Sequence, residues 1–474
     1  MRYCFIYILI LFSLFGFCQG FQRQYELPGS LNNTAKAVFE TTPNNYIMGG
    51  LVVDTLNGIQ TNRLTFFGIN SQGQKTWTKK YGNSKFQYLD NNLIARWFYK
   101  QGNFLYHAGA VLDSNNNYLG VFIKIGLNGD TIWQKKFYDP AYKVYPQMVT
   151  GSEDGGFFIT GFFEQTGNRP VMLIKTDING NELWRKKITK SGPNIHDAKA
   201  IAQDSASKKI VMVGYQYIGT SNKDNVLICD SLGNKISENS YAGGGYGAAF
   251  NDLIQTKDKK FVAVGARIHP AVGGLTLTKS FIIKFDVNTP GILDWEINNF
   301  DTLQLVNWFS CVKELKNGDI LVGGILDTSY MNGRPTQAQN RMTRIGQNGN
   351  IKWNRTYNYS INSALSYNQK INAINIASNG DWLAAFELIN ASPNPFFFVR
   401  YDSTGCDSSI LYCQSLIGLN EIKNINAELS VYPNPTSGSL CFRNANLINS
   451  GPIKLKIINS LGQTVRQEEL IFSE

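Results

Sequence analysis

The chain has 474 residues, and its 45 Lys and Arg residues against 35 Asp and Glu residues give a formal net charge of +10. The basic residues are spread along the chain rather than clustered, so the composition does not support nucleic-acid binding. The chain is rich in Gly, Asn, Tyr, Phe and Trp and has no convincing helical period. This composition favours short strands joined by tight turns.

The first twenty residues have the pattern of a secretory signal peptide. A basic residue, Arg2, precedes an apolar run from Cys4 to Phe17, and small and polar residues follow it. A membrane-spanning helix would need roughly 20 apolar residues, and this run is shorter. We expect cleavage after Gly20. A lipid anchor on Cys18 is disfavoured, because the bulky Phe17 stands where the lipidation signal needs a small residue.

The remaining cysteines are too few for a disulfide framework. They are Cys229, Cys311, Cys406, Cys413 and Cys441. Cys406 and Cys413 are close enough in sequence to form one local bridge. Two unpaired thiols at these positions are an equal alternative.

One unit recurs seven times between the signal peptide and residue 413. It consists of an apolar strand, a turn, a strand ending in Gly, a variable loop, an apolar strand that often holds Lys, and a Gly turn. The turn glycines recur every 51 to 58 residues and are Gly73, Gly129, Gly180, Gly233, Gly291, Gly349 and Gly405. A near-constant period of this size indicates stacked supersecondary units. Each unit holds about four strand-length runs, which is the content of one propeller blade. We therefore predict an all-β fold with a seven-bladed β-propeller over residues 21–413.

A tryptophan follows the turn glycine by four residues in five of the seven repeats. These residues are Trp77, Trp133, Trp184, Trp295 and Trp353, and the fourth and seventh repeats carry Ser237 and Ser409 instead. A large aromatic side chain at one register in each repeat is typical of packing rather than of ligand contact. We expect each Trp to fill space between adjacent blades.

The N-terminal end of the mature chain offers a way to close the ring. The segment 21–25 has aromatic residues at the same spacing of four as Trp77 and Tyr81 in the first repeat. We predict that this segment completes the last blade, whose own Trp is missing. Pairing there would join the two ends of the ring and remove an exposed strand edge.

The repeat resembles the tryptophan-containing propeller repeats of exported bacterial proteins. The stretch from Asp177 through Gly180 to Trp184 also resembles, more distantly, the Asp-x-x-Gly-x-x-x-Trp signature of quinoprotein-type propellers. The resemblance covers residues from about 21 to 413. Its motif is specific for the fold and hardly for the function.

The last part of the chain resembles a type IX secretion C-terminal sorting domain. A linker over 414–428 leads to a segment, 429–474, that carries both halves of the family pattern. The matching residues are Tyr432, Pro433, Asn434, Pro435 and Gly438 in the opening turn and Gly462 in a later turn. In that family the segment is an immunoglobulin-like β-sandwich that binds the type IX secretion machinery. The resemblance implies Sec export followed by passage across the outer membrane, and a secreted or cell-surface location.

This C-terminal segment departs from the family pattern at its end. It stops at Glu474 without the final Gly-x-Tyr strand and the terminal basic strand that the family normally has. We therefore expect an incomplete sorting domain. If it does not function, the protein stays in the periplasm.

No residue pattern in the chain forms a catalytic or metal-binding set. The three histidines, His107, His196 and His269, fall at unrelated positions of their repeats, which leaves little basis for a histidine metal site or a Ser-His-Asp relay. Asp177 and Asn179 alternate like calcium-loop ligands, but a hairpin turn explains them better. We expect no cofactor and no metal.

Cations recur at one register of the outer strand. Lys79, Lys135 and Lys186 each stand two residues after the Trp of their repeat. Such a ring of positive charge could bind an anionic polysaccharide or a lipopolysaccharide surface. Solvated outer-strand charges that protect strand edges are the favoured alternative.

The sequence favours a non-catalytic binding module of the cell surface or medium, with no transmembrane helix in the mature chain. Loops between blades carry the specificity in such a fold. The longest loops hold Arg267, His269, Tyr330 and Arg334, which are the candidate contacts for an extracellular glycan or protein. The alternatives are a periplasmic assembly scaffold and an enzyme, either a quinoprotein-like dehydrogenase or a glycosidase with two channel carboxylates.

Overall fold

The computed structural model describes most of the repeat region and four short pieces that follow it. The described residues are 21–89, 98–189, 196–218, 221–241, 247–269, 277–298, 306–327, 330–331, 334–335, 338–357, 359, 368–389, 394–406, 429–432, 441–444, 453–458 and 464–470. The predicted signal peptide (1–20) and linker (414–428) lie outside this set, as do Cys413, Pro433, Asn434, Pro435, Gly438 and Gly462.

The chain divides into two compact units, 1–408 and 409–474. The second unit contains two separate hairpins, β32 (Leu429–Tyr432) with β33 (Cys441–Asn444) and β34 (Ile453–Ile458) with β35 (Thr464–Leu470). Tyr432 of the predicted sorting motif is the last residue of β32. In the described part of the chain, no helix is long and apolar enough to cross a bilayer.

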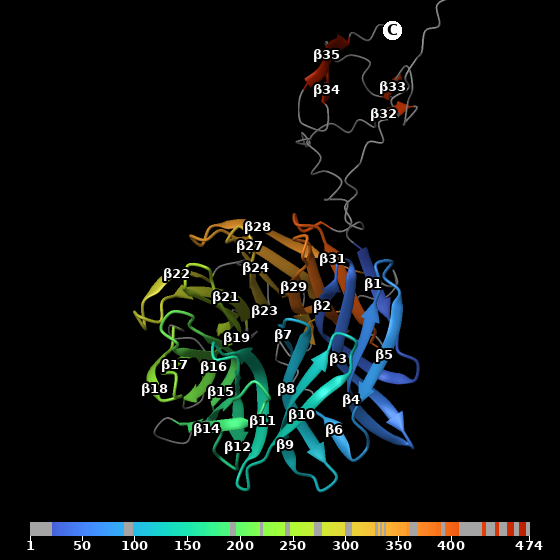
Figure 1. Ribbon diagram of the computed structural model, residues 1–474. Helices are drawn as coiled ribbons and strands as arrows, with labels where there is room; N and C mark the ends of the chain where they lie inside the picture. The colour runs from blue at the N-terminus through green and yellow to red at the C-terminus, as the bar shows by residue number, and fades with distance from the viewer. Residues whose placement is uncertain are drawn as a thin grey trace, which may run out of the picture. The chain divides into compact units, whose positions relative to one another are not determined.

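The first unit is an all-β propeller, whose sheets follow one another around a ring with β5, β18 and β22 at the rim (Figure 1). The first repeat forms the sheet β2 (Ser30–Thr42), β3 (Asn45–Leu56), β4 (Ile59–Ile69) and β5 (Lys75–Tyr81). The second forms β6 (Phe86–Tyr88), β7 (Phe98–Gln101), β8 (Phe104–Asp113), β9 (Tyr118–Gly126) and β10 (Thr131–Phe137). The third forms β11 (Lys143–Gly151), β12 (Phe157–Glu164), β13 (Val171–Thr176) and β14 (Glu182–Ile188).

The next three repeats share one 12-stranded sheet. Repeat 4 contributes β15 (His196–Gln203), β16 (Ile210–Ile218), β17 (Ser221–Cys229) and β18 (Lys235–Asn239). Repeat 5 contributes β19 (Gly247–Gln255), β20 (Phe261–His269), β21 (Leu277–Phe285) and β22 (Leu293–Ile297). Repeat 6 contributes β23 (Val306–Glu314), β24 (Ile320–Asp327), β27 (Ala338–Ile345) and β28 (Ile351–Tyr357), and its loop holds the small hairpin β25 (Tyr330–Met331) and β26 (Arg334–Pro335).

The prediction of seven separate blades needs correction, because hydrogen bonding divides the described propeller into five sheets. Within each of the three repeats the strands are antiparallel. Two parallel bridges between the repeats join them into one 12-stranded sheet. Each bridge is one residue pair, Asn222 with Gly247 and Thr278 with Val306. Sequence periodicity reveals the repeated unit, but it carries no information about such contacts between units.

The N-terminal strand closes the ring, as predicted. β1 (Phe21–Tyr25) pairs antiparallel with β31 (Phe396–Tyr401), whose sheet also contains β30 (Trp382–Ile389) and β29 (Asn368–Ile376). The Phe21 ring lies 5.1 Å from that of Phe398. The first strand of the chain is therefore the outer strand of the last sheet.

The recurring Trp packs against the next repeat, which confirms the packing prediction. A side chain at Gly129 would place its Cβ 2.5 Å from the Trp77 ring, and a Cβ at Gly180 would lie equally close to the Trp133 ring. Both glycines have a positive φ, which suits Gly alone. At the closing joint Phe21 takes the place of the Trp, and it lies against Gly73. Each of these glycines therefore allows the tight turn and leaves room for the aromatic side chain of the neighbouring repeat.

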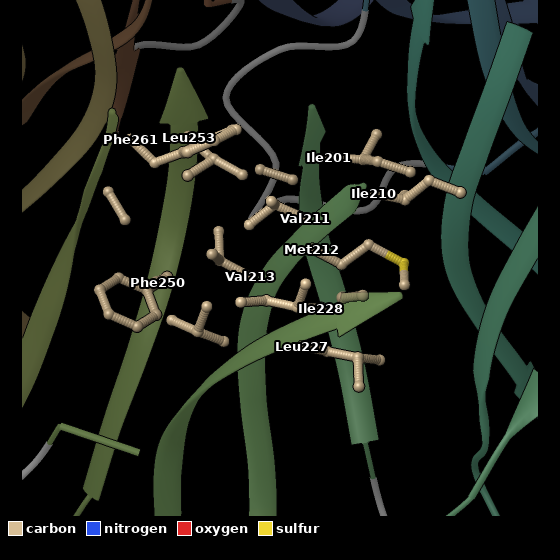
Figure 2. Close-up of a cluster of buried hydrophobic side chains, with 14 of the residues drawn as sticks. Ile201, Ile210, Val211, Met212, Val213, Leu227, Ile228, Phe250, Leu253 and Phe261 are labelled. Carbon is tan, nitrogen blue, oxygen red and sulfur yellow. The ribbon is translucent and has the colours of Figure 1, made fainter. Parts of the chain in front are cut away.

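The core lies between neighbouring sheets and repeats. Figure 2 shows Val211, Val213 and Ile228 of repeat 4 facing Phe250 and Phe261 of repeat 5. These side chains come from adjacent repeats and are buried. Burial of apolar surface is the main contribution to the stability of such a fold. The ring is thus held together by apolar contacts between repeats.

Candidate functional site

Six of the seven innermost strands carry a β-bulge at the same point, and the extra residue is polar in every one. The bulge residues are Lys36, Gln147, Lys199, Asn251, Ser310 and Asn372. We call this set the polar collar. The corresponding part of the second repeat lies in 90–97, outside the described residues. A bulge re-aims a side chain and often stands near a functional site.

The bulges explain the recurring glycine, which lies inside the second strand of most repeats. Gly161, Gly214 and Gly265 each pair with the residue just before a bulge. A Cβ at Gly214 would lie 1.8 Å from the carbonyl oxygen of Asp197. Only glycine admits this close backbone approach. The repeated Gly of the sequence therefore pairs with the residue before each collar residue and lets the two backbones approach closely.

The collar residues join neighbouring repeats by hydrogen bonds. The Lys199 amine donates to Asn251 Oδ1 at 3.1 Å, and Asn251 Nδ2 donates to the carbonyl oxygen of Phe309 at 2.8 Å. Across the closing joint, Asn372 Nδ2 donates to the carbonyl oxygen of Ala35 at 2.7 Å. Side chains of the collar thus bridge repeat 4 to 5, 5 to 6 and 7 to 1.

A cavity of about 200 Å³ opens on one side of the collar. Three of its lining residues, Lys199, Asn251 and Ser310, belong to the collar. The rest of the lining is Asn222, Ala248, Ala249, Ala266, Ile268, Thr278, Trp308 and Lys370. The inner strands β15, β19, β23 and β29 therefore meet around one space, which we call the first cavity.

Lys199 is a buried cation in the wall of the first cavity, with only 4% of its surface exposed. Burial lowers the pKa of its amine, and the charge of Asp197 opposes that effect. Burial also raises the pKa of the Asp197 carboxyl, against the pull of Lys199. Both shifts favour the neutral forms, because charges are costly away from water. An anion in the cavity would favour the charged amine.

A second cavity of about 400 Å³ lies on the other side of the collar, where the inner strands end. Its lining includes Glu40, Lys100, Lys313, Met148 and Tyr99. Glu40 already accepts hydrogen bonds from the backbone N–H groups of Asn44 and Ser378. The Lys100 amine donates to the carbonyl oxygen of Glu40 at 2.7 Å. Several polar groups of the second cavity therefore have partners within the protein.

The outer-strand lysines face the next repeat. Lys79 forms an ion pair with Asp130, and the Lys186 amine donates to Asn234 Oδ1 at 3.3 Å. Lys135 lies close enough to Asp177 to help lower the pKa of that carboxyl, together with the larger effects of hydrogen bonds from Asn181. The structure brings these lysines to the joints between repeats. Their predicted anion-binding role stays a prediction.

Arg267 is a structural contact at the joint between repeats 4 and 5. It pairs with Glu296, lies 3.5 Å from Asp224, and donates to the carbonyl oxygen of Tyr241. Its guanidinium group lies 4.1 Å from the Phe281 ring centroid. These partners hold the guanidinium group at the joint, while its buried Nε–H has no hydrogen-bond partner among the described residues. The predicted ligand contact of Arg267 stays a prediction.

The other predicted loop contacts are described through their backbone alone. His269 pairs with Leu277 at the end of β20, and Tyr330 and Arg334 belong to the β25–β26 hairpin. These residues lie on two different repeats. Their predicted role as ligand contacts stays a prediction.

The Asp177 turn has the geometry of a hairpin rather than of a calcium loop. Asp177 Oδ1 accepts the backbone N–H groups of Asn179 and Asn181, and its Oδ2 accepts the Asn181 side-chain amide. Both carboxylate oxygens are therefore engaged within the turn. Among the described residues, no group of three or more His, Cys, Asp or Glu side chains could hold a metal ion.

Sequence reasoning missed the polar collar, although a signal was present. Lys36 and Lys199 each stand between two alanines, and Asn251, Ser310 and Asn372 each directly follow a large apolar residue. Comparing the first strand of each repeat would have aligned these polar residues. Pairing with the second strand is needed to show that they are bulge residues.

Comparisons with known proteins match the fold and not a family. No family model and no curated protein matches the chain. The β-propeller domain of the Trilobed protease from Pyrococcus furiosus is 8% identical, with a TM-score of 0.45 over 81% of this chain and 98% of that chain. A PL25 ulvan lyase is 9% identical, with a TM-score of 0.43 over 68% of this chain and 83% of that chain.

A glycosyl hydrolase from Bacteroides ovatus is also similar, at 12% identity and a TM-score of 0.33 over 81% of this chain and 87% of that chain. Such low identities carry no conclusion about substrate or activity. The chain is an all-β propeller by its own strand pairing, and its ligand must be argued from its own cavities.

Proposed function

We propose that this chain is a secreted or cell-surface, non-catalytic β-propeller binding protein that takes an anionic ligand in its first cavity. One observation carries the proposal. Among the described residues that line this cavity, the charged ones are two lysines, Lys199 and Lys370, and no carboxylate is part of the lining. A concave site with a few convergent polar groups is the usual form of a ligand pocket, and two cations in it favour an anion.

The same lining favours binding over hydrolysis. A glycosidase of the common type needs two carboxylates that flank the scissile bond. The described residues that line the first cavity provide amines, amides, two hydroxyls and an indole ring, and no acid. Glu40 lines the second cavity, where its carboxylate oxygens hold two backbone N–H groups.

The proposal includes a ring of seven structural blades. Repeats 4, 5 and 6 each form their own four antiparallel strands, and single residue pairs join them. One pair of bridging residues adds little to the many contacts within each repeat. Treated as separate blades, the three repeats with the other four sheets surround one channel.

The export route is part of the same proposal: Sec export, then type IX secretion through the segment 429–474. One feature of the described residues supports an extracytoplasmic location. Cys406 is disulfide-bonded, and structural disulfides are typical of oxidising compartments. The prediction that Cys413 is its partner stays a prediction.

Binding of an acidic polysaccharide such as polygalacturonate to the full chain, measured by isothermal titration calorimetry, tests the function. Lys370→Gln should weaken binding by about tenfold to a hundredfold, since a hydrogen bond to a charged group contributes about 1.5–3 kcal/mol. The matched control is Lys85→Gln, which changes an exposed lysine outside both cavities.

A triple variant, Lys79→Gln with Lys135→Gln and Lys186→Gln, tests the outer-strand cations separately. If it abolishes binding while Lys370→Gln leaves binding intact, the ligand binds at the rim and the cavity proposal is wrong. Failure of the chain to bind any acidic polymer would contradict both versions.

A further inference from the structure

The floor of the first cavity holds two polar groups with unused hydrogen-bonding capacity. Ser310 is 4% exposed, and its Oγ has no hydrogen-bond partner among the described residues. Lys199 carries three N–H donors when charged, and its amine donates one hydrogen bond, to Asn251 Oδ1, among the described residues. Buried polar groups normally have partners, so a hydroxyl left without one at a cavity wall points to a ligand atom.

The walls above this floor are largely apolar, with Asn222, Thr278 and Lys370 as the other polar lining residues. Trp308, Ile268 and three alanines, Ala248, Ala249 and Ala266, line the cavity beside the polar floor. A liquid water molecule occupies about 30 Å³, so a cavity of about 200 Å³ is far larger than one ion needs. This shape fits an organic body with a charged group at one end.

The collar separates the first cavity from the second. Lys199, Asn251 and Ser310 line the first cavity, and no collar residue lines the second. The second cavity begins beyond the bulges, with Met148 and Val149 directly after Gln147 and with Lys313 three residues after Ser310. Hydrogen bonds from collar side chains to the neighbouring repeat link repeats 4 to 5, 5 to 6 and 7 to 1 at this level. The collar therefore lies between the two cavities and provides the floor of the first.

We infer that the first cavity is a blind site for the carboxylate of a small organic acid, with Lys199 and Ser310 on the collar as its ligands. The inference rests on the proposed function and names the chemical class that the cavity takes. The ammonium of Lys199 and the hydroxyl of Ser310 both donate to the carboxylate, and Trp308 and Ile268 contact the body of the acid. An acidic monosaccharide has this chemistry, whether it is free or forms the end of a polymer.

Lys370 has a different part in this arrangement. It lines the cavity but is only half-buried, and it stands opposite Glu387 in the β29–β30 pairing. It therefore offers a further charged donor to the anion, while Lys199 and Ser310 on the floor bind the carboxylate.

Calorimetry on the full chain with galacturonate, galactose and inorganic phosphate tests the inference. Galacturonate should bind, and galactose should bind at least tenfold more weakly because it lacks the carboxylate. Lys199→Met removes the charge but keeps an unbranched side chain of similar size, and it should weaken galacturonate binding about tenfold or more, in line with loss of a charged hydrogen bond.

Ser310→Ala is the second variant, because it removes a hydroxyl without a partner among the described residues and should leave the fold intact. It should weaken galacturonate binding about fivefold, as expected for one hydrogen bond. The matched control is Lys313→Met, which changes a lysine of the second cavity and should leave the affinity unchanged. A trigalacturonide that binds as well as the monomer would identify a chain end as the source.

Three results would overturn the inference. Equal affinity for galactose and galacturonate would show that the cavity does not recognise the carboxylate. Equal affinity for phosphate would show an anion site without a place for an organic body. Unchanged galacturonate binding by Lys199→Met and Ser310→Ala would place the acid elsewhere. If acidic polymers still bind in a Lys370-dependent way, the proposed function survives any of these results.

Discussion

At the scale of single residues, a repeated ion pair explains the charged residue inside the apolar third strand. Asp154 pairs with Lys175, Asp319 with Arg344, and Asp381 with Arg400, each within its own repeat. Asp258 and Lys284 form the same pair in repeat 5. The turn before the second strand supplies the acid, and the third strand supplies the base. The recurring Lys of the sequence motif is therefore structural.

Replacing Asp319 tests this interaction. Asp319 is 3% exposed and accepts hydrogen bonds from Arg344 Nε and the Lys352 amine, both at 2.7 Å. Asp319→Asn should destabilise the protein by about 2–3 kcal/mol at pH 7, because breaking a buried pair leaves a charge without its partner. Urea unfolding measures this change. Asp294→Asn, in the more exposed pair with Lys260, should cost less than about 1 kcal/mol.

The effect of Asp319 should depend on pH in a defined direction. Burial alone would raise the pKa of this carboxyl, but hydrogen bonds from Lys352, Asn317 and Arg344 outweigh it and lower the pKa below the ordinary 3.8. The folded state therefore binds this proton less readily than the unfolded state. The stabilisation is present above pH 3.8 and is lost as the pH falls through the folded pKa. A difference between Asp319→Asn and the parent that stayed constant down to pH 2 would contradict this account.

At the scale of elements, the closing strand β1 carries more stability than its five residues suggest. It pairs with β31 at all five positions, and Tyr25 is 6% exposed. The Tyr25 hydroxyl donates to the carbonyl oxygen of Gly73 in the first repeat at 3.0 Å. β1 thus belongs to the last sheet and contacts the first.

Deleting residues 21–27 should lower the melting temperature by about 10 °C or more. The deletion removes buried apolar surface and leaves β31 as an unpaired edge. Differential scanning calorimetry on chains that begin at residue 21 or at residue 28 measures the loss. The control is Gln24→Ala, which changes an exposed side chain in the same strand. An unchanged melting temperature for the deletion would mean that β1 does not close the ring.

At the scale of the whole molecule, the proposed export route depends on two segments, 1–20 and 429–474, that lie wholly or mostly outside the described residues. An antibody against the propeller, used on fractions of the native host and followed by intact mass measurement, tests it. We expect surface or medium location, a chain that begins at Phe21, and loss of the segment after about residue 420. Retention in the periplasm at full mass to Glu474 would favour the scaffold alternative and would show that the shortened sorting segment fails.

The sequence by itself determined the features that repeat. The turn glycines need a positive φ, so they stay visible in the sequence at every turn. The aromatic spacing of residues 21–25 matched the outer strands, so closure of the ring could also be predicted. The charged strand residues and the Trp positions followed the same period, because each repeat packs against its neighbours in the same way.

Tertiary structure alone decided the features that depend on pairing between distant segments. A bulge exists only relative to its partner strand, so the polar collar and the Ser310 hydroxyl could not be recognised from one strand. The bridges that merge three repeats into one sheet, and the partners that occupy Arg267, lie between repeats. A cavity is enclosed by several strands at once, and no periodic pattern within one strand reports it.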